Sequence, residues 1–225
     1  MIKKLLIFSI FLNLALIGGG VSIFSIDELR VVLYKNLVYK IGTPQVFLAG
    51  DSLTRRNSDL VWFVGKSNFN VVNKAVDGHT ILQVHRNIQD SILPKNPCLV
   101  VVMAGTNRQE NISIERSLEV YEEVIKEIKS THSDIIVLET PLTKRQRLNE
   151  YINQLNANLK EITKNNNVEF FPTNTIISKS GELNSDYTQD GVHFNSNGYK
   201  ILNDSLVPFI KSAYKAKRFE CENIF

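Results

Sequence analysis

The sequence predicts a three-layer α/β domain with a parallel sheet, extending from about Gln45 to about Lys215. Short apolar runs without polar alternation recur in this region, which is typical of strands buried on both faces. Longer amphipathic stretches separate these runs, and strands that alternate with helices indicate a parallel sheet. The apolar runs are 46–49, 71–72, 99–104, 135–138 and 168–171, and the amphipathic stretches are 80–92, 114–129, 148–164 and 197–215.

The first 26 residues have the pattern of a translocation signal, because Lys3 and Lys4 precede a long apolar stretch that ends in three glycines. About 20 predominantly apolar residues span a bilayer, and 5–26 supplies about that length. No A-x-A-like cleavage site follows the glycines, so we expect a signal anchor; a cleaved signal peptide and a secreted protein are the alternative. The positive-inside rule then places the rest of the chain outside the cytoplasm, in the periplasm or the extracellular space.

Two further segments flank the predicted domain. Residues 27–44 have helix-like apolar spacing and form a connecting helix, which Thr43-Pro44 ends because proline disfavours helix in the residue before it. The domain itself occupies 45–215, and 216–225 forms a tail.

The composition is that of an ordinary folded chain. Of the 225 residues, 43% are hydrophobic and 22% are charged, which excludes a disordered, collagen-like or disulfide-scaffold protein. Lysine and arginine number 26 against 23 acidic residues, for a net charge of +3. A nucleic-acid-binding domain would show a clustered basic face, so we expect no nucleic-acid partner.

The two cysteines give no sign of a shared function. Cys98 lies in an apolar run and is expected to be a small buried thiol, whereas Cys221 lies in the tail. Their placement makes a disulfide between them a poor expectation. No C-x-x-C pattern indicates metal or redox chemistry.

Small polar residues and glycines follow three of the predicted strands. In open α/β sheets, sites form just beyond the carboxyl ends of the strands, and glycine there allows tight turns and close approach to a ligand. The three endings are Gly50-Asp51-Ser52, Asp77-Gly78-His79 and Gly105-Thr106-Asn107.

Ser52 and His193 are the candidates for nucleophilic chemistry. A serine hydroxyl needs a neighbouring base, and His193 lies in a polar loop with Asp190 three residues before it. That acid can hold one imidazole nitrogen and leave the other free to take the proton of a hydroxyl. The alternatives are a helix N-cap for Ser52 and an exposed loop histidine for His193.

An acyl-transfer site also needs hydrogen-bond donors aimed at the developing oxyanion. The backbone N–H groups of Ser52 and Gly78 and the side-chain amide of Asn107 provide three candidates. Glycine and asparagine are also common turn residues, so neither is specific by itself.

Together these segments resemble the four conserved blocks of the SGNH/GDSL hydrolase family, in order. The blocks are Gly50-Asp51-Ser52-Leu53, residues 73–78 (NKAVDG), Gly105-Thr106-Asn107 and Asp190-Gly191-Val192-His193. The resemblance implies a flavodoxin-like sandwich with five parallel strands.

The resemblance also implies a role for each matched residue. Ser52 is the nucleophile, His193 is the general base and then the acid, and Asp190 orients His193. Ser52 and Gly78 donate backbone N–H groups to the oxyanion, and Asn107 donates its side-chain amide. No metal or organic cofactor is implied.

One position departs from the family pattern. Many members place an acid after the asparagine of the third block, whereas this chain has Arg108. Arg108 either faces the substrate, where it favours a negatively charged or sugar ligand, or faces solvent. His79 is expected to line the pocket.

Three functions follow from these observations. The first is a serine hydrolase of carboxylic esters, with short-chain or O-acetyl esters of envelope or extracellular glycans or lipids as substrates. We favour acetylated carbohydrate, because no long apolar insertion provides a lid for a fatty chain. The second is an O-acyltransferase with the same triad, and the third is an inactive membrane-tethered binding protein.

Overall fold

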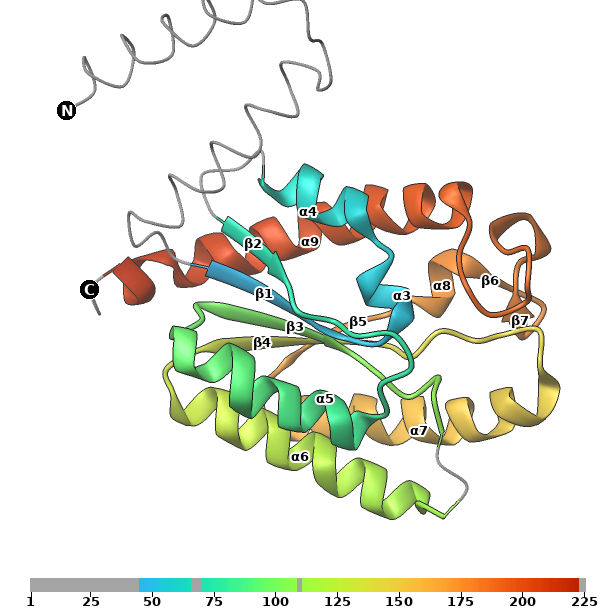
Figure 1. Ribbon diagram of the computed structural model, residues 1–225, viewed down its shortest axis with the longest axis horizontal. Coiled ribbons are helices and arrows are strands. Elements are labelled where there is room, and N and C mark those ends of the chain that lie inside the picture. Colours follow the sequence, from blue (N-terminus) through green and yellow to red (C-terminus); the bar gives the residue numbers. More distant parts are fainter. Residues whose placement is uncertain (1–44, 66–69, 109–110, 223–225) are drawn as a thin grey trace, which may run out of the picture. The chain divides into compact units, whose positions relative to one another are not determined.

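Five short parallel strands form the centre of the molecule (Figure 1). The computed structural model describes residues 45–65, 70–108 and 111–222, all within one unit, Gly42–Phe225. The strand order is β2-β1-β3-β4-β5, and each neighbouring pair is parallel. The predicted α/β fold with a five-stranded parallel sheet is therefore confirmed. The strands are β1 (Gln45–Gly50), β2 (Asn70–Asn73), β3 (Leu99–Met103), β4 (Asp134–Leu138) and β5 (Glu169–Phe171).

Helices cover both faces of this sheet and complete the three layers. In Figure 1, α5 (Ile81–Asn87), α6 (Ile114–Ser130) and α7 (Gln146–Asn165) lie on one face, and α4 (Ser58–Gly65) and α9 (Ser196–Glu222) lie on the other. Shorter elements lie between them: α3 (Ser52–Arg55), η1 (Ile88–Ile92), η2 (Leu93–Lys95), α8 (Asn174–Ile177), β6 (Ser178–Lys179), β7 (Glu182–Leu183) and η3 (Ser185–Tyr187).

Alternate residues of the strands feed two separate cores. In β3, Val101 packs with Leu202 and Leu206 of α9, whereas Val100 belongs to the core beneath α5, α6 and α7. All five residues of β3 are buried. Both faces of the strand are apolar because both are covered, which explains the unbroken apolar runs in the sequence.

The strand order places a topological switch point between β1 and β3. Connections leave these adjacent strands in opposite directions, so a crevice opens beyond their carboxyl ends. The segments after β1 and β3 carry the first and third sequence blocks. The fold therefore brings together blocks that lie about 50 residues apart in the chain.

Several predictions about elements differ from the structure. The predicted helix 80–92 consists of α5 followed by a π-helical turn, η1, and α9 extends to Glu222, into the predicted tail. The apolar helix of 1–26 and the connecting helix of 27–44 lie outside the described residues. No helix within the described ranges is long and apolar enough to cross a membrane.

The expectation of a free thiol at Cys98 is wrong, because Cys98 is disulfide-bonded. Cys98 is buried just before β3. The sequence contains one other cysteine, Cys221, whose side chain lies outside the described residues. An apolar flank predicted burial correctly, but burial alone does not distinguish a thiol from a disulfide.

Candidate active site

Ser52 is the first residue of α3, at the end of β1. Asp51 precedes it as the N-cap, with Oδ1 accepting a hydrogen bond from the Leu53 N–H at 2.9 Å. Because Asp51 caps the helix, the Ser52 hydroxyl is not needed for that role. The Ser52 N–H lies in the first helical turn, where amides have no partner within the helix.

Gly50 allows the tight turn between β1 and α3. A Cβ atom at this position would lie 2.4 Å from the Met103 carbonyl oxygen and 2.4 Å from Thr54 Oγ1. The Met103 oxygen is backbone of β3 and cannot move aside easily. Glycine is therefore required here by close packing of two strand ends.

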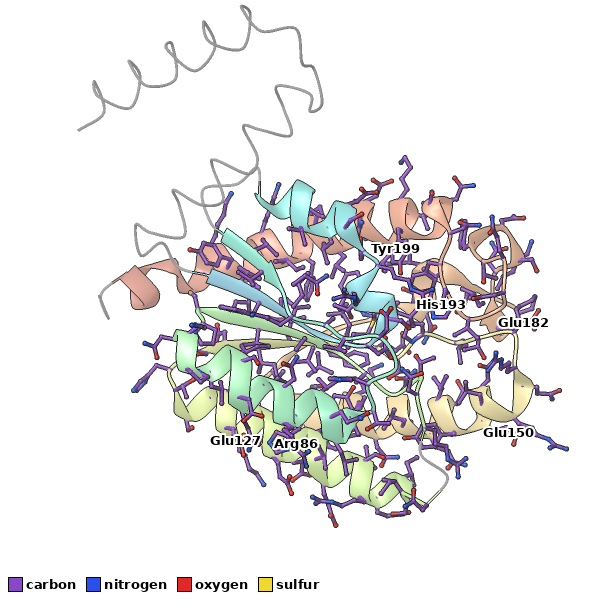
Figure 2. The ribbon with its side chains drawn as sticks, viewed as in Figure 1. Arg86, Glu127, Glu150, Glu182, His193 and Tyr199 are labelled. Carbon is purple, nitrogen blue, oxygen red and sulfur yellow. The ribbon has the colours of Figure 1, made fainter. Side chains whose placement is uncertain are left out.

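The fold brings Ser52 and His193 into direct contact across 141 positions of sequence. Ser52 Oγ lies 2.9 Å from His193 Nε2. Ser52 is 7% exposed, so its hydroxyl is held at the floor of the site rather than on the open surface. Figure 2 shows His193 beside α3, next to Tyr199.

Asp190 holds the other nitrogen of the same ring. Asp190 Oδ2 lies 2.6 Å from His193 Nδ1, while Oδ1 accepts from the N–H groups of His193 at 2.7 Å and Val192 at 2.9 Å. These hydrogen bonds, that from His193 above all, hold the pKa of Asp190 well below its ordinary value. An ionised carboxylate only accepts, so Nδ1 carries the proton and Nε2 is left to accept from Ser52.

The loop that carries Asp190 and His193 is fixed at several points. The Lys144 N–H donates to the Gly191 carbonyl oxygen at 2.7 Å, and Gly191 has a φ of +79°, which glycine tolerates best. The Lys144 side chain forms an ion pair with Glu182 of β7. After the loop, the Tyr199 hydroxyl donates to the Leu53 carbonyl oxygen at 3.0 Å and ties α9 to α3.

Asn107 lies between the ends of β1 and β2. Its Nδ2 donates to the His79 carbonyl oxygen at 3.2 Å and reaches Asp51 Oδ2 at 3.4 Å. The Val76 N–H donates to the Gly50 carbonyl oxygen at 3.0 Å, which fixes the segment that contains Gly78 beside β1. Gly78 has a φ of +77°, a conformation that favours glycine.

Asp51 is a buried acid in the centre of this arrangement. It is 1% exposed, and burial raises its pKa to about 6 despite the hydrogen bond from Leu53. The Asp51 carboxyl caps α3 with Oδ1 and contacts the Asn107 amide with Oδ2. The sequence block contained Asp51, but its contact with Asn107 depends on the meeting of two strand ends.

Arg108 is exposed, as one of the two sequence alternatives expected, but it is also placed against a ring. Its guanidinium carbon lies 5.1 Å from the centre of the Tyr151 ring, a cation–π contact. Gly105, Asn107, Arg108 and Tyr151 help to line a small cleft beside the site. Tyr151 lies on α7, and no sequence pattern indicated that it would reach the third block.

The other three histidines do not contact Ser52 or His193 through any hydrogen bond of the described residues. His79 contributes its carbonyl oxygen to Asn107, while its ring Nδ1 is buried without a hydrogen-bond partner in the described structure. His85 contacts Glu123 and Glu127 of α6, and its side chain is only 13% exposed, so it is packed between α5 and α6 and is not a surface residue. His132 is an exposed turn residue.

Other candidate sites are less well supported. A groove of about 920 Å³ lies between α7 and the edge strand β5, and none of the predicted site residues lines it. No group of three or more His, Cys, Asp or Glu side chains in the described ranges is arranged to hold a metal ion.

Comparison with known proteins shows the family of the chain. Residues 48–201 match the model of the GDSL-like lipase/acylhydrolase family. The chain is 37% identical over 89 residues to an N-acylneuraminate cytidylyltransferase of Escherichia coli O18:K1:H7. The match covers 37% of this chain and 20% of that relative, so the chain spans about one fifth of its length.

Solved structures share the fold at low sequence identity. An acylhydrolase of Bacteroides fragilis superimposes with a TM-score of 0.69 at 23% identity, covering 80% of this chain and 95% of that one. A GDSL-like lipase of Bacteroides thetaiotaomicron gives 0.69 at 19%, covering 81% and 97%. An acetyl-xylooligosaccharide esterase of Geobacillus gives 0.64 at 17%, covering 74% and 93%. At these identities the likeness concerns the fold.

Proposed function

The chain belongs to the GDSL-like lipase and acylhydrolase family, and from this premise we propose that it is an ester-hydrolysing enzyme that cleaves short-chain carboxylic esters through an acyl-enzyme on Ser52. The observation that carries this proposal is the continuous contact from Ser52 Oγ through His193 to Asp190, at 2.9 Å and 2.6 Å. Both lengths are within hydrogen-bond range.

In the proposed mechanism, Ser52 Oγ attacks the ester carbonyl carbon while its proton passes to His193 Nε2. The tetrahedral intermediate then collapses, the bond to the leaving alcohol breaks, and His193 returns the proton to that alcohol. Water repeats the sequence on the acyl-enzyme and releases the acid. Asp190 keeps the imidazole in the required tautomer and stabilises it when it is protonated.

The charge that develops on the carbonyl oxygen needs donors. We assign this role to the N–H groups of Ser52 and Gly78 and to Asn107 Nδ2. Loss of one such donor typically lowers kcat by about 10²–10³. Contacts with the His79 carbonyl oxygen at 3.2 Å and Asp51 Oδ2 at 3.4 Å hold Asn107 Nδ2 at the end of β1, and in this proposal the oxyanion replaces the longer of the two contacts.

We propose acylated carbohydrate as the substrate class. The side chains that follow the third block, Asn107 and the exposed Arg108, are polar and can hydrogen-bond to sugar hydroxyls, and the crevice that they line, at about 10 Å³, has no room for a fatty chain. The names of two similar proteins, an acetyl-xylooligosaccharide esterase and an N-acylneuraminate cytidylyltransferase, also refer to acylated sugars.

We propose further that the domain acts outside the cytoplasm, in the periplasm or the extracellular space, anchored by residues 1–26. The disulfide at Cys98 supports this, since disulfides persist in oxidising compartments. Protease added to intact cells should degrade the domain if an outer membrane is absent or permeabilised. Protection until the cytoplasmic membrane is broken would contradict this placement.

The catalytic proposal is tested with single substitutions. Ser52→Ala and His193→Ala should each lower release of nitrophenol from 4-nitrophenyl acetate by a factor of about 10² or more, and a fluorophosphonate probe should label the wild type but not Ser52→Ala. Ser58→Ala and His132→Asn are matched controls at exposed positions and should keep wild-type activity. Wild-type turnover in the Ser52 variant would exclude the acyl-enzyme.

Product analysis with a saccharide acceptor separates hydrolysis from acyl transfer. The proposal expects the acetyl group to appear as acetate in water. Transfer of most acetyl groups to a sugar hydroxyl would identify an acyltransferase that uses the same triad.

A further inference from the structure

Arg108 places a positive charge next to the proposed oxyanion donor. It directly follows Asn107, and its side chain is exposed. Both residues line the same small cleft, together with Gly105 of the third block. A ligand whose ester carbonyl lies at Asn107 therefore has Arg108 as an immediate neighbour.

Contact with Tyr151 orients the guanidinium. The Arg108 guanidinium carbon lies 5.1 Å from the ring centre. The ring is held in place because the Tyr151 hydroxyl donates to Ser117 Oγ at 3.3 Å, and Ser117 Oγ–H donates to the Ser113 carbonyl oxygen at 3.1 Å. Stacking uses the face of the guanidinium and leaves its N–H donors at the edge available.

No carboxylate of the described residues satisfies this group. Three other arginines of the described residues do form ion pairs. Arg55 and Arg56 pair with Asp77, and Arg116 pairs with Glu119 and Glu123. Arg108 has the cation–π contact but no such pair within the described part of the chain. A planar donor edge that is oriented but unpaired is suited to bidentate recognition of a carboxylate.

We propose that Arg108 is a specificity-determining residue that binds a carboxylate carried by the ester substrate, so that the preferred substrates are O-acylated sugar acids. This inference rests on the proposed esterase function and specifies its substrate class. Tyr151 acts as the positioning residue that holds the guanidinium next to Asn107 through the cation–π contact. The ester-cleaving steps are unchanged, because Arg108 contacts a part of the substrate that does not react.

The test compares two substrates that differ in one group. These are a mono-O-acetyl hexuronic acid and the O-acetyl hexose with the acetyl group at the same ring position. A charge-assisted pair typically supplies roughly tenfold in affinity, so the wild type should prefer the acid by about that factor in kcat/KM. Arg108→Gln should abolish the preference, mainly through a higher KM for the acid.

Two further variants separate binding from a structural role. Tyr151→Leu should reduce the preference for the acid, because the guanidinium loses its platform. Arg86→Gln is the matched control, since Arg86 is an exposed arginine on α5 and lies away from His193 in Figure 2. This variant should keep the wild-type preference for the acid.

Three outcomes decide the inference. An equal kcat/KM of the wild type for both substrates would overturn it while leaving the esterase function intact. An equal loss of kcat/KM for both substrates in Arg108→Gln would also overturn it, because Arg108 would then contribute to the shape of the cleft and not to recognition of the carboxylate. Failure of the wild type to cleave either sugar ester or 4-nitrophenyl acetate would instead refute the proposed function itself.

Discussion

At the scale of single residues, the site depends on two aspartates in opposite environments. Asp190 is exposed and accepts several hydrogen bonds, so its pKa is lowered and it stays ionised beside His193. Asp51 is buried, and burial raises its pKa to about 6. Asp190 holds the His193 imidazole in one tautomer. Asp51 holds the segment after β1 in place, and its burial lowers the stability of the folded state when its carboxyl is ionised.

Replacement of Asp190 by Asn should impair catalysis with little effect on folding. An amide in this position retains an oxygen for the backbone N–H groups of Val192 and His193, but it removes the charge that stabilises protonated His193. We expect kcat for 4-nitrophenyl acetate to fall by roughly a hundredfold, with KM nearly unchanged. Asp186→Asn, at an exposed residue of η3, is the control. Wild-type kcat in Asp190→Asn would show that the carboxylate does not act through His193.

Asp51 should make the folded state less stable as the pH rises. Its pKa is raised from 3.8 to about 6 on folding, so the folded state binds the proton more tightly than the unfolded chain does. The stabilisation by this proton is complete below about pH 4 and is lost as the pH rises to about 6, by as much as about 3 kcal/mol.

The variant Asp51→Asn tests this dependence, because asparagine also caps helices but does not titrate. The free energy of unfolding of Asp51→Asn minus that of the wild type should be larger at pH 7.5 than at pH 4, because only the wild type loses stability over this range. Urea unfolding of both proteins at the two pH values measures the difference. A constant difference would mean that Asp51 does not change its protonation between the folded and unfolded states in this range.

At the scale of elements, side-chain hydrogen bonds couple the helices that hold the two catalytic segments. Asn57, between α3 and α4, exchanges two amide hydrogen bonds with Asn203 of α9, at 2.9 Å and 2.8 Å. Both residues are buried. This pair and the Tyr199–Leu53 contact fix the distance between α3, which carries Ser52, and the start of α9, which follows His193.

Removing one asparagine of this pair should lower the free energy of unfolding by more than half of the amount that is lost when both are removed. Asn203→Ala leaves the Asn57 amide buried without its partner, at about 1–3 kcal/mol. The double variant Asn57→Ala/Asn203→Ala should be less destabilised than the sum of the single variants. Urea unfolding of all four proteins completes the cycle, and strict additivity would contradict the coupling.

At the scale of the whole molecule, the sheet order defines the crevice of the site, whereas the disulfide lies away from it. The switch point between β1 and β3 supplies the crevice. The loop just before α9, the helix that covers the face opposite α5, α6 and α7 (Figure 1), carries His193 to Ser52. Cys98 lies at the start of β3, at the other end of that strand from Asn107.

Reduction of the Cys98 disulfide should therefore lower stability more than activity. Disulfides typically contribute about 2–4 kcal/mol, chiefly by restricting the unfolded chain. We expect a lower Tm in the presence of a phosphine reductant, with kcat for 4-nitrophenyl acetate unchanged below that Tm. Cys98→Ser should unfold at a Tm that does not depend on the reductant. An equal Tm of the wild type with and without reductant would argue against the bond.

The sequence by itself predicted the α/β fold class, the three long helices α6, α7 and α9, and the candidate residues of the site. Apolar runs predict strands that are covered on both faces, and the four sequence blocks predict the chemistry. Both predictions depend only on local residue type. Only the tertiary structure decided the disulfide at Cys98, the placement of Tyr151 against Arg108 and the contact of Asp51 with Asn107. The contacts of Arg108 with Tyr151 and of Asp51 with Asn107 join segments distant in the chain, and local pattern carries no information about which distant groups the packed sheet and helices bring within a few ångströms.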